Sequence, residues 1–394
     1  MTALTPNARA RAVAESATLA ISARAAEMIA AGQDVVSLSA GEPDVGTPED
    51  VARAGIQAIE SGHTRYTATS GLPQLRRGAA SWLKKQFGLD YDASEVMVTA
   101  GAKAALHMAL TSIVEPGDRV LLLAPYWVSY PDLVRVAGGD PITIAPVPDQ
   151  GFVHTGEQIA AAAKEHGARG VLMNFPNNPS GAVPTREQME DIVDAVVAND
   201  MWIISDEIYA TMVYEGKFSS PATLAAARDR TIFVGGATKS HSFTGWRVAF
   251  LAGPKDVIAA AGRVQSQVIG NPCTISQHAA IAICEGDHAD ELARRMASFD
   301  ERRRFVIDQV ATINGLELAP PAGAFYALID ARAICERLGV DDMEIARRLL
   351  EDKLLALVPG TPFAIPGFIR ISYAAAMPAL EKGLARLREF VASL

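Results

Sequence analysis

Two stretches of the sequence decide the fold: WIISDEIY at residues 202–209 and TIFVGGATKSHSFTGWR at residues 231–247. Each begins with an apolar run of strand length and continues into polar or small residues, which predicts a buried strand with a functional tip. Parallel strands end at the same edge of a sheet, and open α/β sheets bind ligands at that edge. The pattern therefore predicts that Asp206, Lys239 and Arg247 face one crevice.

These side chains, with Tyr209, suit one cofactor. A lysine amine forms Schiff bases with carbonyl groups, and pyridoxal phosphate also presents a pyridine nitrogen, a phenolic oxygen and a phosphate. We expect Lys239 to hold the aldehyde, Asp206 to keep the pyridine nitrogen protonated, and Tyr209 to hydrogen-bond the phenolic oxygen. Arg247 is expected to bind the phosphate through two N–H groups. Each residue alone has an ordinary structural explanation, but the four in this order favour the cofactor.

A family resemblance supports this interpretation. The segments SDEIY (205–209), TKSHSFTGWR (238–247) and NFPNNPSG (174–181) resemble the signature blocks of class I pyridoxal-phosphate aminotransferases, close to the bacterial aspartate aminotransferase subgroup. Similar blocks run from about Ser37 to Tyr373. The resemblance implies a fold-type I α/β architecture, with a mostly parallel sheet covered by helices in a large domain and a smaller α+β domain. It also implies a homodimer with shared active sites.

Alternating strand and helix patterns agree with this architecture. Helical stretches predicted at Asp191–Ala198 and Ala222–Arg228 alternate with apolar strand patterns, which is typical of βαβ units and a mostly parallel sheet. We expect a large cofactor-binding domain at residues 47–285 and a small C-terminal domain at residues 286–394. Residues 1–46 are expected to form an N-terminal arm and part of the small domain.

Several residues are expected around the phosphate. Gly101, Ala102 and Lys103 form a small-residue turn at a predicted helix N-terminus, where free backbone N–H groups and the helix dipole favour an anion. The resemblance adds Thr238 to this group. It also assigns Tyr66 to the cofactor phosphate of the partner subunit, although a lone tyrosine in such a position is usually a packing residue.

The resemblance also implies residues that contact the ring and the substrate. Trp127 is expected to stack on the pyridine ring, Asn178 to lie beside the phenolic oxygen, and Gly41 to lie against the substrate α-carboxylate. Trp127 and Asn178 would also contact the substrate. Arg370 stands in an apolar strand, where its charge needs a carboxylate partner. The resemblance assigns it to the substrate α-carboxylate, and the alternative is a structural salt bridge. The Asn178–Pro179 bond is expected to be cis.

The substrate is expected to be aspartate or glutamate, paired with a 2-oxo acid. Thr18 and Lys103 fall where similar bacterial aspartate aminotransferases contact the distal carboxylate, although Lys103 could also be a solvent-facing residue of a first helical turn. Val268 and Ile269 stand where the family usually has serine and threonine, which instead fits a larger or aromatic acid such as prephenate. An aromatic or prephenate aminotransferase and a lyase of the same fold are therefore alternatives.

Composition excludes other classes. The chain has 394 residues, 49% of them hydrophobic and 21% charged, which is ordinary for a folded globular protein. A net charge of -9 disfavours nucleic acid or an anionic membrane as partner. A non-catalytic cofactor-binding regulator fused to a DNA-binding domain is disfavoured because only about 40 residues precede Gly41. The short basic run 302–304 is expected to be a solvated or interface stripe.

Cysteine usage and apolar patterning suggest a location. The three cysteines, Cys273, Cys284 and Cys335, lack metal-ligand spacing, so we expect buried thiols, no disulfide and no metal site. No signal-type segment and no apolar stretch of 18 residues is visible. A cytoplasmic enzyme is the expectation that follows.

Overall fold

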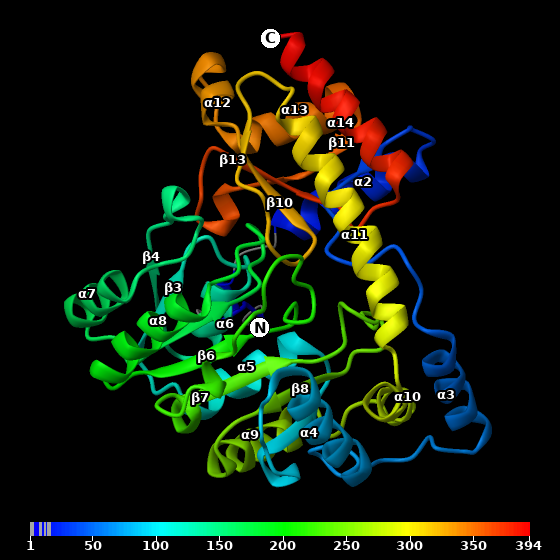
Figure 1. Cartoon of the computed structure of the whole chain (residues 1–394), viewed down its shortest axis with the longest axis vertical. Coiled ribbons are helices and arrows are strands. Elements are labelled where there is room, and N and C mark those ends of the chain that lie inside the picture. Colours follow the sequence, from blue (N-terminus) through cyan, green and yellow to red (C-terminus); the bar gives the residue numbers. More distant parts are fainter. Residues whose placement is uncertain (1–3, 8–9, 12, 14–16) are drawn as a thin grey trace.

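The computed structural model describes residues 4–7, 10–11, 13 and 17–394, without the side chains of residues 17–19. A seven-stranded sheet forms the centre of its larger part (Figure 1). Its strands are β2 (Val96–Thr99), β3 (Arg119–Leu123), β4 (Asp140–Ile144), β5 (Gly170–Asn174), β6 (Trp202–Asp206), β7 (Thr231–Gly235) and β8 (Ala249–Ala252). They lie in the order β2-β8-β7-β6-β5-β3-β4, and β8 runs antiparallel to both neighbours while the other pairs are parallel. The expected mostly parallel sheet is confirmed.

Helices cover both faces of this sheet, which explains why its strands are continuously apolar. One face packs against α5 (Ala102–Ile113) and α9 (Lys255–Val268), and the other against α7 (Gly156–His166) and α8 (Arg186–Ala198). Four more helices complete this part: α3 (Glu49–Glu60), α4 (Pro73–Phe87), α6 (Tyr130–Ala137) and α10 (Thr274–Glu285). Polar groups are therefore left mainly at the strand ends.

Two local predictions are wrong. The stretch Ala222–Arg228 is not an α-helix: it begins within one 3₁₀ turn, η3 (Pro221–Thr223), and ends at the first residue of another, η4 (Arg228–Arg230). The Ser220 side chain accepts a hydrogen bond from the N–H of Ala222, and this local bond competes with helix formation. The cis peptide bonds of the described chain precede Pro125 and Pro176, so the bond before Pro179 is trans.

A second, smaller group of elements lies at the upper end of the molecule in Figure 1. It contains β9 (Glu317–Leu318), β10 (Tyr326–Asp330), β12 (Val358–Pro359) and β13 (Phe368–Ser372), which form an antiparallel sheet in the order β12-β13-β10-β9. Around it lie α11 (Ala289–Val310), α12 (Arg332–Leu338), α13 (Asp342–Lys353), α14 (Met377–Ala392) and α2 (Ala17–Ala30). β1 (Val36–Ser37) pairs in parallel with β11 (Leu355–Ala356), so the N-terminal segment joins this group.

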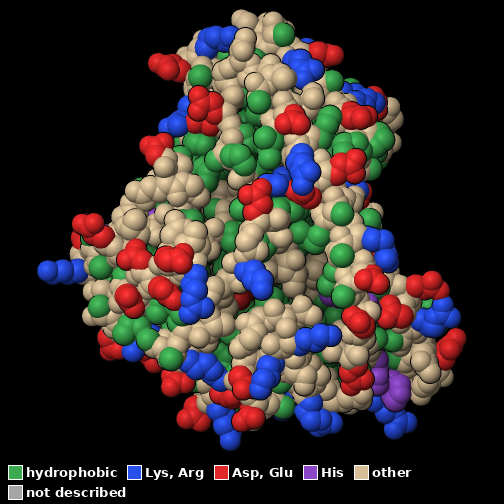
Figure 2. Space-filling model, viewed as in Figure 1, with side chains coloured by type: hydrophobic (Ala, Val, Ile, Leu, Met, Phe, Trp, Pro, Cys, Tyr) green, Lys and Arg blue, Asp and Glu red, His purple; other side chains and the backbone are tan. Residues whose placement is uncertain are grey.

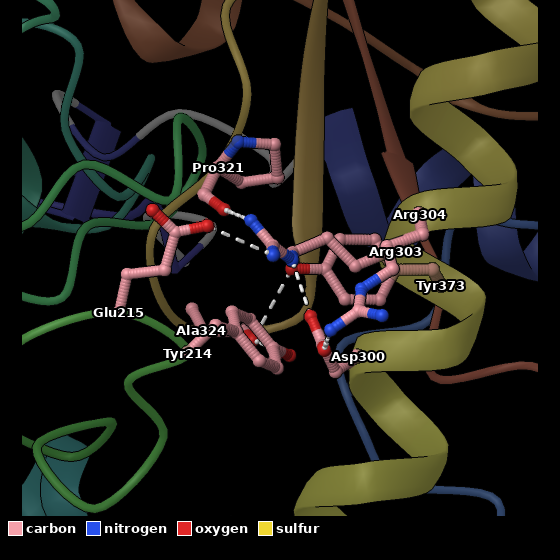
Figure 3. A network of polar contacts seen from close by, with 8 residues as sticks. All are labelled: Tyr214, Glu215, Asp300, Arg303, Arg304, Pro321, Ala324 and Tyr373. Carbon is pink, nitrogen blue, oxygen red and sulfur yellow. Dashed lines mark hydrogen bonds and ion pairs between the residues drawn. The ribbon is translucent and has the colours of Figure 1, made fainter.

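Arg303 of α11 connects this smaller group to the large sheet (Figure 3). Its guanidinium donates to Asp300 at 2.7 Å, to the carbonyl oxygen of Pro321 at 3.1 Å and to Glu215 at 3.2 Å, and it lies 5.0 Å from the ring of Tyr214. Glu215 and Tyr214 belong to the segment that follows β6. Arg303 is buried where two parts of the chain meet, so of the two expectations for this basic run, solvated or interface stripe, the solvated one is wrong for Arg303.

Acidic and basic side chains are interspersed over the face in Figure 2. Among the described residues, no helix is long and apolar enough to cross a membrane, and no cluster of three potential metal ligands occurs. The three cysteines are free thiols. Cys273 is exposed, contrary to expectation, because it stands at the N-cap of α10 on the surface.

Candidate active site

A cavity of about 380 Å³ opens beside the ends of β5 and β6, where Asn174 and Asp206 are neighbours in the parallel register. Its lining brings together eleven of the predicted residues: Gly41, Ala102, Lys103, Trp127, Asn178, Asp206, Tyr209, Thr238, Lys239, Arg247 and Arg370. It also contains residues that the sequence analysis missed: Tyr130, Asn174, Ile208 and Tyr326. The strand ends therefore meet at one crevice, as the topology of open α/β sheets requires.

Asp206 is a buried carboxylate on the floor of the cavity. It accepts hydrogen bonds from the hydroxyl of Tyr130 at 2.7 Å and from the backbone N–H of Ile208 at 3.3 Å. Burial raises the pKa of Asp206 to about 6, although these bonds and the charge of Lys239 act in the opposite direction. Above pH 6 the site therefore holds a desolvated negative charge that favours a cationic partner.

Lys239 lines the same cavity as this acid. Its ammonium group donates to the carbonyl oxygen of Gly41 at 2.6 Å. Burial lowers the pKa of Lys239 to about 8, and the positive charges of Arg247 and Arg370 add to this effect while Asp206 opposes it. A lysine with such a pKa is partly neutral at pH 8 and can act as a nucleophile or a base.

Two tyrosines form a pair on the side of the smaller sheet. The hydroxyl groups of Tyr209 and Tyr326 are 2.8 Å apart, and both side chains are buried. Burial raises the pKa of Tyr209 well above its usual value, and Tyr326 contributes to the shift. Both phenols are therefore neutral at physiological pH, so Tyr209 has a proton to donate. Tyr326 is the first residue of β10 and follows Phe325, an ordinary core pattern from which its position could not be inferred.

The opposite end of the cavity is built for an anion. Gly101 caps the N-terminus of α5 with a positive φ of 91°, and a Cβ there would lie 2.4 Å from the guanidinium of Arg247. Glycine thus lets that guanidinium approach the free N–H groups of the first helical turn. Arg247 donates to the carbonyl oxygen of Thr244 at 2.8 Å, which holds its side chain in this position. Thr238 lines the same cavity.

Arg370 lies deep in the cavity wall and is only 2% exposed. It donates to the side-chain oxygen of Asn178 at 2.9 Å and to the carbonyl oxygen of Ser39 at 2.8 Å, and its Nε atom has no partner. Among the described residues, no carboxylate forms an ion pair with it, so nothing in the described part of the chain supports the alternative of a structural salt bridge. A buried guanidinium without a counter-ion is costly and favours an anionic ligand.

Lys103 lines the cavity from an exposed position, whereas the predicted residues Tyr66 and Thr18 are not among the described lining residues. Lys103 is in the first turn of α5 and exposed, with its ammonium group 4.8 Å from the ring of Trp127. Tyr66 is 97% exposed and lies in a separate surface depression beside Ile269. The backbone of Thr18 lies in α2, but its side chain is outside the part that the structure describes.

Comparison with known proteins agrees with this geometry. Residues 33–387 match the family model described as aminotransferase class I and II. The chain belongs to this family. An aspartate aminotransferase of Geobacillus stearothermophilus is 39% identical over 386 residues, which are 97% of this chain and 98% of that protein. An aspartate/prephenate aminotransferase of Thermus thermophilus is 40% identical over 379 residues, 96% of each chain. The solved structure of the Thermus thermophilus aspartate aminotransferase with maleate is 37% identical in sequence and has a TM-score of 0.93. The match covers 99% of this chain and 100% of that one.

The protein is thus an aminotransferase that depends on pyridoxal phosphate, and its amino and 2-oxo acid substrates are small molecules. The residues of the cavity fit this cofactor. The cradle at Gly101 and Arg247 suits the phosphate, Asp206 suits a protonated ring nitrogen, and the amine of Lys239 lines the same cavity. The charge and hydrogen-bonding groups of the cofactor therefore each have a candidate partner in this aminotransferase.

Proposed function

We propose that this aminotransferase exchanges amino groups between aspartate or glutamate and a dicarboxylic 2-oxo acid. The observation that carries the proposal is the charge of the cavity lining, which contains four basic side chains and one acidic one. Arg247 would serve the cofactor phosphate and Lys239 its aldehyde. Two cations are then left for the substrate, and a dicarboxylate has one anionic group for each of them.

Arg370 would bind the α-carboxylate and Lys103 the distal carboxylate. Arg370 is buried and forms no ion pair with a described acidic residue, and its guanidinium can bind a carboxylate through two N–H groups. Lys103 forms no ion pair with any described acidic residue. Desolvation of its ammonium group and the positive charge of Arg247 both lower the pKa of Lys103. A carboxylate ligand relieves this repulsion. The names of the relatives, aspartate and aspartate/prephenate aminotransferase, support the same substrate class.

The chemistry assigns a role to each remaining residue of the site. Pyridoxal phosphate, when bound, supplies an electron sink for the bonds at the substrate Cα. Asp206 would keep the ring nitrogen protonated, Tyr209 and Asn178 would bond the phenolic oxygen, and Trp127 would cover the ring. Lys239 would remove the proton from the substrate Cα, and its pKa of about 8 suits a base that works near neutral pH.

We also propose a homodimer. Tyr66, Val268 and Ile269 are 97%, 61% and 36% exposed, and large apolar side chains that gather on a surface typically mark an interface. In the dimer Tyr66 would contact the cofactor phosphate of the partner subunit.

Light scattering should give twice the chain mass. Mixing the inactive variants Tyr66→Ala and Lys239→Ala should restore activity, because one site of the hybrid dimer then has both an intact Lys239 and an intact Tyr66 from the other subunit. Activity that is not restored would contradict a shared site.

The proposal also covers the domain boundaries and the cellular location. The large domain would comprise residues 47–285, with residues 1–46 and 286–394 forming the smaller one, which agrees with the distribution of the two main sheets and with the pairing of β1 and β11. Three free thiols are in keeping with a reducing compartment, so we propose a cytoplasmic location.

A kinetic panel tests the substrate assignment. Aspartate, glutamate, phenylalanine and leucine would each be measured against 2-oxoglutarate, with the wild type and with Lys103→Ala. We expect aspartate or glutamate to have the highest kcat/KM, and Lys103→Ala to lower it by about 10²-fold through loss of the distal contact. A higher kcat/KM for leucine than for aspartate, unaffected by Lys103→Ala, would contradict the proposal. Product formation without any added 2-oxo acid would instead indicate a lyase.

A further inference from the structure

The segment 240–246 joins Lys239 to Arg247 and is named here the lysine loop. Ser242 within the loop and Arg247 at its end have positive φ values, 51° and 57°, although neither residue is glycine. Such backbone conformations are unfavourable for residues with a Cβ atom and persist only where surrounding contacts hold them. The contacts that hold the lysine loop therefore bear on the positions of both Lys239 and Arg247.

Arg295 of α11 provides one of these contacts. It is only 9% exposed, and its guanidinium donates to the hydroxyl of Ser242 at 2.8 Å, to the carbonyl oxygen of Gly46 at 2.7 Å and to Glu291 at 2.7 Å. Glu291 lies one turn earlier in α11 and holds the guanidinium in this position. α11 extends from the smaller group of elements to the segment before α3 (Figure 1). Arg295 thus connects the lysine loop to a helix of the smaller group.

The segment 41–47 also holds the lysine loop. The hydroxyl of Thr47 donates to the carbonyl oxygen of Ser242 at 2.9 Å and accepts from the indole N–H of Trp246 at 3.0 Å. The same segment receives the hydrogen bond from Arg295 at Gly46. Ser242, the strained residue of the loop, is therefore held through its carbonyl oxygen by Thr47 and through its hydroxyl by Arg295.

We propose that Arg295 is a positioning residue, which holds the lysine loop so that Lys239 and Arg247 reach the bound cofactor together. The inference rests on the roles proposed for Lys239 and Arg247. It adds to them a residue that is not among the described residues lining the active-site cavity. Arg295 acts through Ser242 and touches neither the cofactor nor the substrate.

Loss of this contact should affect the chemical step more than substrate binding. The lysine loop connects the proposed base to the proposed phosphate ligand, whereas Arg370 and Lys103, the residues proposed for the substrate carboxylates, lie in β13 and α5. A displacement of about 1 Å at a catalytic group can lower a rate by about 10²-fold. We therefore expect kcat to fall while the KM for aspartate stays close to the wild-type value.

The bound cofactor should report the same displacement. Burial and the nearby charges, Arg247 among them, set the pKa of Lys239. Movement of the lysine loop changes the distances between these charges and the nitrogen of Lys239. The pH at which the absorbance of bound pyridoxal phosphate changes should therefore shift, and a weaker hold by Arg247 should release the cofactor faster.

The test compares Arg295→Met with a matched control, Arg294→Met. Arg294 also pairs with Glu291, at 2.6 Å, but its side chain is 70% exposed and forms no hydrogen bond with the described lysine loop. Three quantities are measured: kcat and KM with aspartate and 2-oxoglutarate, the pH midpoint of the cofactor absorbance, and the rate of cofactor release on dilution. The last two need no substrate. Ser242→Ala removes the same hydrogen bond from the loop side and replaces Arg295→Met if the latter does not fold.

We expect Arg295→Met and Ser242→Ala each to lower kcat by about 10–10²-fold, to shift the absorbance midpoint and to speed cofactor release. The double variant should be little worse than Arg295→Met, because both substitutions break the same hydrogen bond. Arg294→Met should behave like the wild type.

Two results would overturn the inference. One is an Arg295→Met protein that is less stable to urea but keeps the wild-type kcat, midpoint and release rate, because Arg295 would then serve stability alone. The other is an equal loss in Arg294→Met. Borohydride labelling of the wild type separates this failure from that of the proposed function: a label on a residue other than Lys239 would refute the role of Lys239 and the inference with it.

Discussion

Replacement of Glu207 by glutamine should change how the stability of the protein depends on pH. Glu207 follows Asp206 in the sequence but is 1% exposed and points away from the active-site cavity. The hydroxyl of Ser220 donates to its Oε1 at 2.6 Å, and its Oε2 has no partner. Burial raises the pKa of Glu207 from 4.5 to about 8, and the charge of Asp206 adds to this effect. Glu207 is therefore protonated at neutral pH in the folded protein.

The size of the effect follows from this pKa. The folded state binds the proton more tightly than the unfolded state, so the stabilisation is complete below pH 4.5 and is lost as the pH rises through 8. At 1.36 kcal/mol per pH unit, the free energy of unfolding should fall by roughly 3–4 kcal/mol between pH 5 and pH 8 through this group alone. Glutamine resembles protonated glutamate in shape and does not titrate. Glu207→Gln should therefore lack this decrease.

Urea denaturation of the cofactor-loaded protein at pH 5, 6, 7 and 8 measures the difference. The free energy of unfolding of Glu207→Gln should rise relative to that of the wild type with each increase in pH, and it should be the larger of the two at pH 8. Glu60→Gln, at an exposed glutamate of α3, is the matched control and should keep the wild-type slope. Unfolding free energies of Glu207→Gln that run parallel to those of the wild type over this range would refute the argument, because Glu207 would then be ionised in the folded state.

Three further substitutions test the active site and the contact between the two parts of the chain. Lys239→Ala should lower kcat by about 10²–10⁴-fold through loss of the base, and borohydride reduction followed by peptide mapping should label Lys239 in the wild type only. Asp206→Asn should retain pyridoxal phosphate after dialysis, measured by absorbance, but lose most transamination; near-normal turnover would contradict its role at the ring nitrogen. Arg303→Met should lower the free energy of unfolding by about 1–3 kcal/mol, because Pro321 and Asp300 lose a buried donor. An unchanged Tm would show that the Arg303 contacts in Figure 3 do not contribute to stability.

The positions of the residues at the strand ends could be predicted from the sequence, because they depend on local apolar patterns and on the rule that parallel strands end at the same edge of a sheet. The apolar runs before Asp206 and before the glycines that precede Lys239 specify β6 and β7, and parallel strands must end at the same edge of the sheet. The small-residue turn at Gly101 was likewise visible as a helix start after a strand. These features need no knowledge of how distant parts of the chain pack.

The remaining site residues depend on contacts that local pattern does not specify. Tyr326 reaches Tyr209 from a different sheet, and the two residues are 117 positions apart in the sequence. Tyr130 contacts Asp206 across 76 positions, although it is only three residues after Trp127. The burial of Arg303 arises in the same way, from packing of α11 against the segment around Glu215. The domain boundaries and the roles of the site residues, Tyr66 and Thr18 among them, stay predictions.

The adjacent acids Asp206 and Glu207 have different surroundings and therefore different protonation states. β6 ends at Asp206, which lines the cavity, whereas the next residue, Glu207, is buried and does not line it. Both are desolvated, but Asp206 also receives hydrogen bonds from Tyr130 and Ile208 and the field of Lys239. Its pKa consequently rises only to about 6, against about 8 for Glu207. Near pH 7 one acid is therefore charged and available to a cationic ring, whereas its neighbour is neutral and adds no second negative charge beside it.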